Sequence, residues 1–288
     1  MNIFPLEVNG NKKAGSLFSL MIFSFIVFNL IVSLVLRVVG LGAELLSALS
    51  TLSILFASIT ASVLTNKDKK SLLSLVNEKI SPVYIAVAVL IAFSMIFGLG
   101  FINALIEKFF SSIGITAPAT DLNVSNAGEF ILYSIFLALV PAVAEELFFR
   151  GVLITNLKTD NLTKILISAL CFSVYHCSIN KLAYQFIYGA ILALIFIKTN
   201  NLILPIITHF LNNFIILTVD FIGITVDLFN PICIAVGVAV LAVCLMLLLK
   251  NLKLKNQLEQ VEKAKDFFIP YSLIGFIICL VMIVGGVL

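Results

Sequence analysis

The sequence FILYSIFLALVPAVAEELFFRGVLITNL, residues 130–157, is an almost continuous apolar run that contains three charged side chains, Glu145, Glu146 and Arg150. About 20 predominantly apolar residues are enough for a helix to cross the hydrocarbon core of a membrane. The length of the run therefore predicts a membrane-spanning helix. A charged side chain at mid-membrane costs roughly 2.5–3.5 kcal/mol, so three in one span indicate a neutralising partner or a function.

The composition of the whole chain agrees with a membrane protein. Of its 288 residues, 61% are hydrophobic and only 11% are charged, and the mean hydropathy is +1.18. Soluble domains carry about 25% charged residues, so the composition excludes a cytosolic enzyme, a secreted domain and a disordered protein. The net charge of +3 is too small for a nucleic-acid-binding surface, and the expected partner is the lipid bilayer.

Further apolar runs bring the number of candidate spans to nine. Their hydrophobic residues do not alternate with polar ones as in a membrane β-barrel, so the backbone must be satisfied within helices. The predicted fold class is an all-α, polytopic transmembrane helix bundle of about eight to ten spans. The nine candidates are residues 17–39, 45–64, 82–106, 130–157, 162–179, 182–197, 202–222, 231–249 and 269–288.

The distribution of positive charge predicts the orientation of the bundle. With nine spans and the N-terminus in the cytosol, 15 of the 18 Lys and Arg residues fall on the inner side and 3 on the outer side, as the positive-inside rule requires. We therefore expect a multi-pass protein of the cell membrane with its C-terminus outside. Two basic inner connections, residues 66–81 and 250–266, are expected to be solvated linkers, with contact to anionic lipid headgroups as the alternative.

Two other spans carry polar side chains that an apolar helix does not need. His176 lies in the fifth candidate span, and His209, Asn212 and Asn213 lie in the seventh. His176 and His209 are the only histidines in the chain. Isolated polar residues elsewhere, such as Tyr184 in the sixth span, are expected to make hydrogen bonds between helices.

The depths of these side chains are similar. At a rise of 1.5 Å per residue from the cytosolic ends of their helices, Glu145 and His176 lie about 20 Å deep, Asn213 about 18 Å and His209 about 12 Å. All four are therefore expected near the middle of a hydrocarbon core that is about 30 Å thick. Such convergence from three helices favours one shared site over scattered, unrelated polar residues.

Helical spacing separates the two adjacent glutamates. Glu146 and Arg150 are four residues apart, so they share a helix face and can neutralise each other. Glu145 points about 100° away, and its neighbours at three and four residues include no basic side chain. Glu145 is left without a local counter-charge, which suits a carboxylate that acts as a general base.

These residues form three ordered sequence motifs on apolar segments. The patterns are EExxxR at 145–150, FxxxH at 172–176 and HxxxN at 209–213. They resemble the motifs of the CPBP family, which comprises CAAX prenyl proteases type II and bacteriocin-processing-type bacterial membrane proteins. The flanking sequences EELFFRGVL and LPIITHFLNN are also similar to the family's, and the resemblance covers about residues 130–222.

The resemblance implies an intramembrane endopeptidase in a helical bundle whose site opens towards the cytosol. By this resemblance, Glu145 and His176 would hold and deprotonate the attacking water. His209 and Asn213 would stabilise the oxyanion of the tetrahedral intermediate. The expected substrate is a membrane-associated peptide or protein, and a prenylated CAAX end is the substrate of one branch of the family. No cofactor is expected.

The same resemblance gives Glu146 and Arg150 a supporting role and divides the chain into three regions. Residues 1–129 would form N-terminal spans and connections. Residues 130–222 would form the catalytic core, and residues 223–288 would form C-terminal spans with a basic cytosolic linker.

Three alternatives stay open from the residues alone. Glu145, His176 and His209 could instead bind a catalytic zinc ion with an open fourth position, although the chain contains no HExxH motif. Ionisable residues in spans also mark transporters and proton relays, but the chain shows no repeated halves. A non-catalytic membrane regulator or immunity protein is the third alternative.

Overall fold

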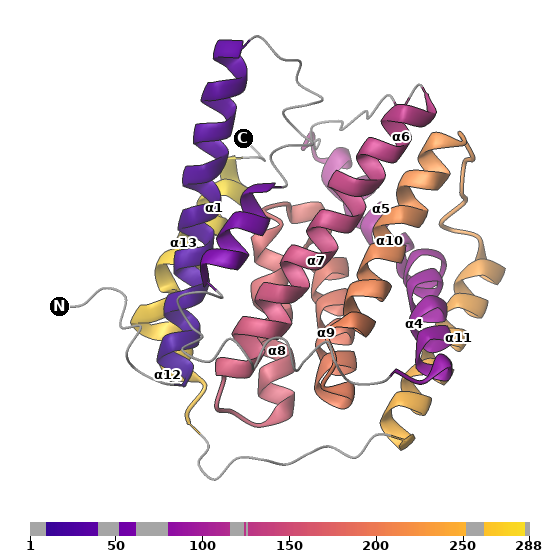
Figure 1. The fold of residues 1–288 in the computed structure, drawn as a ribbon. Coiled ribbons are helices and arrows are strands. Elements are labelled where there is room, and N and C mark those ends of the chain that lie inside the picture. The colour runs from indigo at the N-terminus through magenta and orange to yellow at the C-terminus, as the bar shows by residue number, and fades with distance from the viewer. Residues whose placement is uncertain are drawn as a thin grey trace.

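Within the residues that the computed structural model describes, every regular element is a helix and no strand occurs (Figure 1). The all-α, multi-pass fold expected from the sequence is confirmed. The described residues are 10–39, 52–61, 80–115, 124, 126–251 and 262–285. The predicted basic connections at 66–81 and 250–266 lie largely outside these ranges.

The helices follow one another in the order of the predicted spans. Between α1 and α4 the structure describes one further helix, Leu52–Ala61. The other elements are α1 (Asn11–Val39), α4 (Pro82–Ser94), η1 (Met95–Leu99), α5 (Phe101–Ser112), α6 (Ala127–Tyr133), η2 (Ser134–Leu139), α7 (Val140–Glu146), η3 (Leu147–Ile154), α8 (Asn161–Tyr175), η4 (Ile179–Lys181), α9 (Leu182–Thr199), α10 (Ile203–Phe221), α11 (Pro231–Asn251), α12 (Lys265–Phe267), η5 (Phe268–Ser272) and α13 (Leu273–Gly285).

Six helices in the described part of the chain are long and apolar enough to cross a membrane. Three of the nine predicted spans correspond instead to shorter apolar helices, Leu52–Ala61, Asn161–Tyr175 and Pro270–Gly285. Parts of the predicted spans 45–64 and 269–288 lie outside the described residues. The six long helices are Asn11–Val35, Pro82–Ser112, Ala127–Ile154, Ile179–Thr199, Ile203–Phe221 and Pro231–Lys250.

The helix that carries both adjacent glutamates is continuous but contains two wide, π-helical turns. It runs from α6 through η2, α7 and η3, and η2 and η3 are the π-helical segments. Pro141, at the start of α7, accounts for the first of these, because proline has no N–H to donate and its ring crowds the preceding turn. π-Helical turns within α-helices frequently occur at functional sites. Here they flank Glu145 and Glu146 on both sides.

Helix α8 ends earlier than predicted. It begins after Asp160, whose side chain accepts a backbone hydrogen bond from the first turn, and it ends at Tyr175 with His176 as the capping residue. Cys177 then adopts a left-handed conformation (φ 47°), which an α-helix cannot continue. The predicted span 162–179 is therefore wrong at its end, and His176 lies at the end of a helix rather than inside one.

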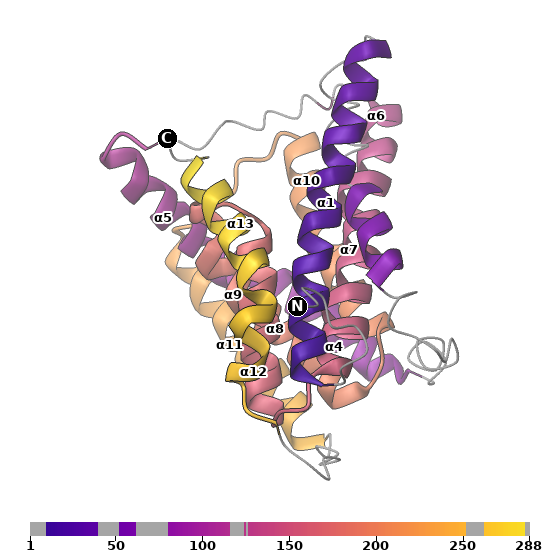
Figure 2. The ribbon, with the colours of Figure 1, turned by 90° about the vertical axis from the view of Figure 1, so that its left-hand side faces the viewer.

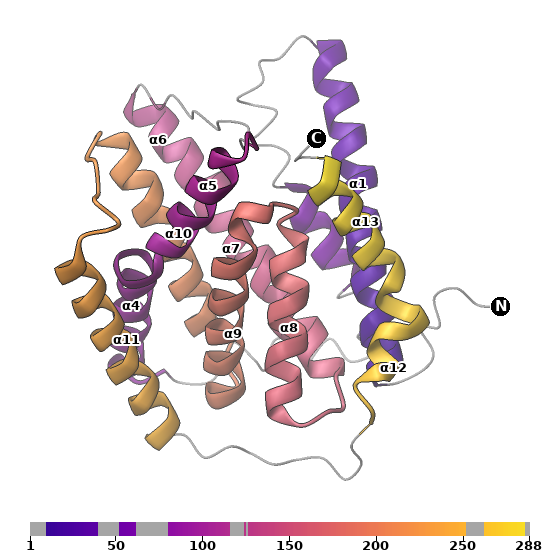
Figure 3. The same cartoon turned by 180° about the vertical axis from the view of Figure 1, so that it is seen from behind.

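The helices that bear the polar motifs lie in the middle of the bundle. Helices α8 and α9 form a hairpin, and α10 packs against α4, α7 and α9. Helices α4 and α11 cover one flank, and α1 with α13 covers the other (Figures 1 and 3). Figure 2 shows that α1 and α13 meet at their lower ends and diverge towards their upper ends.

A fully buried asparagine near the start of α1 joins three distant parts of the chain. The Asn11 backbone N–H donates to Glu262 Oε2 at 2.8 Å, and its Nδ2 donates to the Lys263 carbonyl at 3.1 Å. Its Oδ1 accepts from the backbone N–H of Lys158 at 2.9 Å. We call Asn11, Lys158, Glu262 and Lys263 the Asn11 hub. The hub fixes the loop between η3 and α8 to both terminal segments.

Candidate active site

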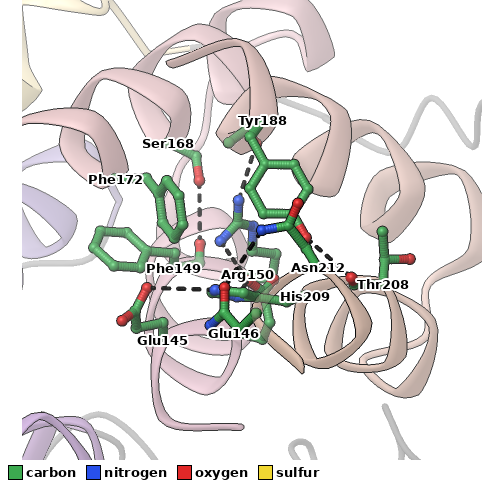
Figure 4. Close-up of polar contacts among 12 residues, drawn as sticks. Glu145, Glu146, Phe149, Arg150, Ser168, Phe172, Tyr188, Thr208, His209 and Asn212 are labelled. Carbon is green, nitrogen blue, oxygen red and sulfur yellow. Dashed lines mark hydrogen bonds and ion pairs between the residues drawn. The ribbon is translucent and has the colours of Figure 1, made fainter. Parts of the chain in front are cut away.

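Glu146 and Arg150 form the buried ion pair that their spacing predicts. Arg150 Nη1 donates to Glu146 Oε1 at 2.9 Å, and both side chains are fully buried. Arg150 Nη2 donates to the Gly189 carbonyl at 2.9 Å, and the guanidinium carbon lies 4.8 Å from the centre of the Phe172 ring. Arg150 therefore ties η3 to both helices of the α8–α9 hairpin (Figure 4).

Glu146 has a second partner that the sequence analysis did not find. His209 Nδ1 lies 2.8 Å from Glu146 Oε1, and since a carboxylate only accepts, this nitrogen carries the hydrogen. In a neutral imidazole the other nitrogen, Nε2, is then an acceptor. The partners are 63 residues apart in the chain, so no local spacing could have indicated this contact.

His176 is held in a similar tautomer by its own helix. Its Nδ1 lies 2.7 Å from the backbone carbonyl of Phe172, which only accepts, so Nδ1 is the donor. This hydrogen bond is possible because α8 ends at Tyr175 and leaves its last carbonyls without helical partners. The Nε2 atom of His176 is left as an acceptor.

The second glutamate faces the Nε2 atoms of both histidines. Glu145 Oε2 lies 3.9 Å from His176 Nε2 and 3.9 Å from His209 Nε2. These separations are too long for direct hydrogen bonds, and the buried Oε2 has no hydrogen-bond partner among the described residues. One carboxylate oxygen and two imidazole nitrogens thus converge from α7, the end of α8 and α10. From their depths, the sequence predicted that four side chains converge. Glu145, His176 and His209 do so, whereas the contact that the structure gives for Asn213 is with Asn212.

The two adjacent asparagines of α10 are hydrogen-bonded to each other, and Asn212 is also hydrogen-bonded to α9. Tyr184 donates its hydroxyl hydrogen to Asn212 Oδ1 at 3.0 Å, the kind of interhelical bond expected for this tyrosine. Asn212 Nδ2 donates to Asn213 Oδ1 at 3.4 Å. One turn further along α9, Tyr188 donates to the Thr208 carbonyl at 3.0 Å. The sequence did not indicate a role for Tyr188, because a tyrosine in an apolar helix usually packs in the core.

A catalytic zinc ion needs its donor atoms closer together than Glu145 and the two histidines hold them. Tetrahedral zinc sites have bonds of about 2.0–2.2 Å to nitrogen and oxygen, which places the donor atoms about 3.4 Å apart. The 3.9 Å separations of Glu145 Oε2 from both Nε2 atoms are wider. Within the described ranges no group of three His, Cys, Asp or Glu residues has the arrangement of a metal site. As arranged, the three side chains do not fit a zinc ion.

A comparison with family models identifies this region of the chain. Residues 127–215 match the family described as type II CAAX prenyl endopeptidase Rce1-like. The match covers less than half of the chain and supports its resemblance to the CPBP and CAAX protease family; we call residues 127–215 the CPBP segment. The CPBP segment extends from the start of α6 into α10 and contains every residue of the three sequence motifs. A search of curated proteins found no match.

Proposed function

We propose that this multi-pass membrane protein is an intramembrane endopeptidase that cleaves a membrane-associated peptide or protein. The observation that carries the proposal is the convergence of Glu145 Oε2 with the Nε2 atoms of His176 and His209 inside the CPBP segment. Hydrolysis of a peptide bond needs a group that deprotonates water and donors that stabilise the oxyanion. The site contains candidates for both.

In this mechanism Glu145 and His176 activate the attacking water. A water molecule between them can donate one hydrogen to Glu145 Oε2 and the other to His176 Nε2, because both atoms are acceptors. As the water oxygen attacks the carbonyl carbon of the substrate, one proton passes to this pair. When the carbon–nitrogen bond breaks, the same proton moves to the leaving amine, so the pair returns to its starting state.

His209 and Asn213 would stabilise the oxyanion of the tetrahedral intermediate. Since the Nδ1–H of His209 already donates to Glu146, its Nε2 can donate only when the ring is a cation. The buried Glu146 carboxylate is suitably placed to balance that positive charge. Asn213 lies one turn after His209 on α10, so the two side chains share a helix face.

The orientation of the bundle is part of the same proposal. The positive-inside rule places the N-terminus in the cytosol and the C-terminus outside, in a cell membrane. The site would then open to the cytosol. A reporter that is active only in the cytosol, fused to either end of the chain, tests this orientation, and activity at the C-terminal fusion would contradict it.

The central experiment uses the purified full-length chain in nanodiscs with a library of membrane-associated peptides, including prenylated CAAX ends. We expect wild type to cleave at least one class, and Glu145→Gln and His176→Ala to lose about 10²–10⁴-fold in rate, the usual contribution of a general base. Glu107→Gln, an exposed glutamate on α5, is the matched control. Equal cleavage by Glu145→Gln and wild type would contradict the mechanism.

The same assay distinguishes glutamate chemistry from zinc chemistry. We propose a metal-free mechanism that needs no cofactor, so treatment with a chelator should leave the cleavage rate unchanged. Loss of cleavage that Zn²⁺ restores would instead support the zinc-dependent form, with Glu145, His176 and His209 moving closer together as ligands.

A further inference from the structure

A chain of hydrogen-bonded side chains leads from α9 to the amide of Asn213. Its first member is the buried Tyr184, whose hydroxyl donates to Asn212 Oδ1 at 3.0 Å. Asn212, which is also buried, donates from Nδ2 to Asn213 Oδ1 at 3.4 Å. These hydrogen bonds all run in one direction, from the Tyr184 hydroxyl through the Asn212 amide to the amide oxygen of Asn213.

The direction of this chain determines which end of each amide points where. An asparagine side chain has an acceptor end and a donor end, which differ only by a half-turn of the amide. Because the Oδ1 atom of Asn212 is occupied by Tyr184, its Nδ2 is the atom that faces Asn213. Asn213 then turns its Oδ1 towards Asn212, and the hydrogens of its own Nδ2 are directed elsewhere.

Stabilisation of an oxyanion requires the donor end of the amide to face it. A developing negative charge is stabilised by N–H groups held in place before the reaction and is repelled by a carbonyl oxygen. If the Asn213 amide rotated by a half-turn, it would present Oδ1 to the oxyanion. Nothing in the covalent structure of asparagine prevents this rotation, so the orientation must come from its neighbours.

We propose that Tyr184 and Asn212 are positioning residues that hold the Asn213 amide with its N–H groups available to the oxyanion. The inference rests on the proposed function and extends it to two residues that the three motif patterns do not specify. Neither residue touches the reacting atoms. Their contribution is transmitted through Asn213 alone.

A second tyrosine on α9, Tyr188, provides a matched control for the Tyr184 hydroxyl. Tyr188 lies one turn after Tyr184 on α9, and its hydroxyl also bonds to α10, but to the backbone carbonyl of Thr208. Both hydroxyls tie α9 to α10, and only the Tyr184 hydroxyl is connected to the asparagine amides. Comparing kcat of Tyr184→Phe with kcat of Tyr188→Phe therefore distinguishes an effect on amide orientation from an effect on the packing of α9 against α10.

The test is steady-state kinetics on a peptide that wild type cleaves, with products quantified by mass spectrometry. We expect Tyr184→Phe to lower kcat about 10-fold with KM unchanged, a part of the 10²–10³-fold that a whole oxyanion donor contributes. Tyr188→Phe should change kcat less than 2-fold. Asn212→Asp keeps an acceptor for Tyr184 but replaces the Nδ2 donor with a second acceptor, so it should also lower kcat.

A double-mutant comparison provides the decisive readout. In an Asn213→Ala background there is no amide left to orient, so Tyr184→Phe should have no further effect on kcat. A loss of the same size in both backgrounds would overturn the inference, because Tyr184 would then act by another route. Equal losses in Tyr184→Phe and Tyr188→Phe would overturn it as well. Wild type that cleaves no peptide would overturn the proposed function itself, and this inference with it.

Discussion

One carboxylate oxygen, Oε1 of Glu146, accepts hydrogen bonds from two side chains on different parts of the bundle. Arg150 Nη1 lies at 2.9 Å and His209 Nδ1 at 2.8 Å. All three groups are buried, so the charge of Glu146 balances Arg150 permanently and His209 when it is protonated. On the neighbouring face, Oε2 of Glu145 has no hydrogen-bond partner among the described residues, and the Nε2 atoms of the two imidazoles lie 3.9 Å from it.

This difference predicts that two conservative substitutions have different effects on stability. Glu146→Gln leaves Arg150 as an unbalanced buried charge and should cost about 3 kcal/mol or more of stability, together with most of the activity. Glu145→Gln replaces a carboxylate that has no hydrogen-bond partner on its Oε2 with a neutral amide, so activity should fall without loss of stability. Thermal unfolding in detergent, with peptide cleavage measured in parallel, checks both. A lower Tm for Glu145→Gln than for Glu146→Gln would contradict this account.

At the scale of elements, the two ends of α8 are fixed by different means. At its start, Asp160 accepts hydrogen bonds from both the hydroxyl and the backbone N–H of Thr163. At its end, Cys177 turns the chain out of the helix with a positive φ. The position of His176 depends on both, because it is the residue that follows the last helical turn.

The cap at Asp160 predicts a pH-dependent contribution to stability. The hydrogen bonds from Thr163 hold the pKa of Asp160 below its ordinary value, since they favour the charged carboxylate. A carboxylate with a depressed pKa stabilises the fold at pH values above its ordinary pKa. This stabilisation is lost as the pH falls through the pKa of the folded state.

We expect Asp160→Ala to cost about 1 kcal/mol at neutral pH. The difference from wild type should shrink below about pH 4, measured by unfolding at several pH values. A difference that does not change with pH would contradict the cap.

The end of α8 lies against α13, and this contact predicts a specific cross-link. Cys177 Sγ lies 3.8 Å from Met282 Sδ on α13, and Cys279 lies about one turn before Met282 on the same helix. Treatment of the purified protein with a mild thiol oxidant should join Cys177 to Cys279, detected by mass spectrometry of the digested chain. The exposed Cys233 on α11 is the internal control and should not pair with either. A Cys177–Cys233 product would contradict this arrangement of helices.

The sequence predicted what depends on positions within one helix. The pairing of Glu146 with Arg150 follows from the helical repeat, and the shared depth of Glu145 and His176 follows from the rise per residue. Contacts between helices were harder to predict from the sequence. The rotation of α10 that brings His209 to Glu146 is set by packing among several helices, and hydropathy does not report it. The early end of α8 was missed because its apolar run continues to residue 179.

At the scale of the whole molecule, the CPBP segment is connected to segments on both sides of it in the sequence. The CPBP segment covers residues 127–215, whereas the Asn11 hub joins Lys158 within that segment to residues 11, 262 and 263 outside it. The position of the motif-bearing helices therefore also depends on the start of α1 and on the residues that precede α12.

Removal of the Asn11 side chain should weaken these connections measurably. Asn11→Ala eliminates the hydrogen bonds to Lys158 and Lys263 and leaves the one made by the Asn11 backbone. Two buried hydrogen bonds predict a loss of about 2 kcal/mol in stability. Thermal unfolding followed by circular dichroism checks this, with Lys12→Ala at the partly exposed neighbour as the control. Equal Tm values for Asn11→Ala and wild type would show that the hub does not hold the termini.

The Asn11 hub also bears on how the protein is made. The loop before α8 is synthesised long before Glu262 and Lys263, yet it shares Asn11 with them in the finished fold. While the chain is still emerging from the ribosome, Asn11 can meet Lys158 but not its partners near the C-terminus. The surroundings of the site are therefore completed only after Glu262 and Lys263 have been synthesised, long after the motif residues have entered the membrane.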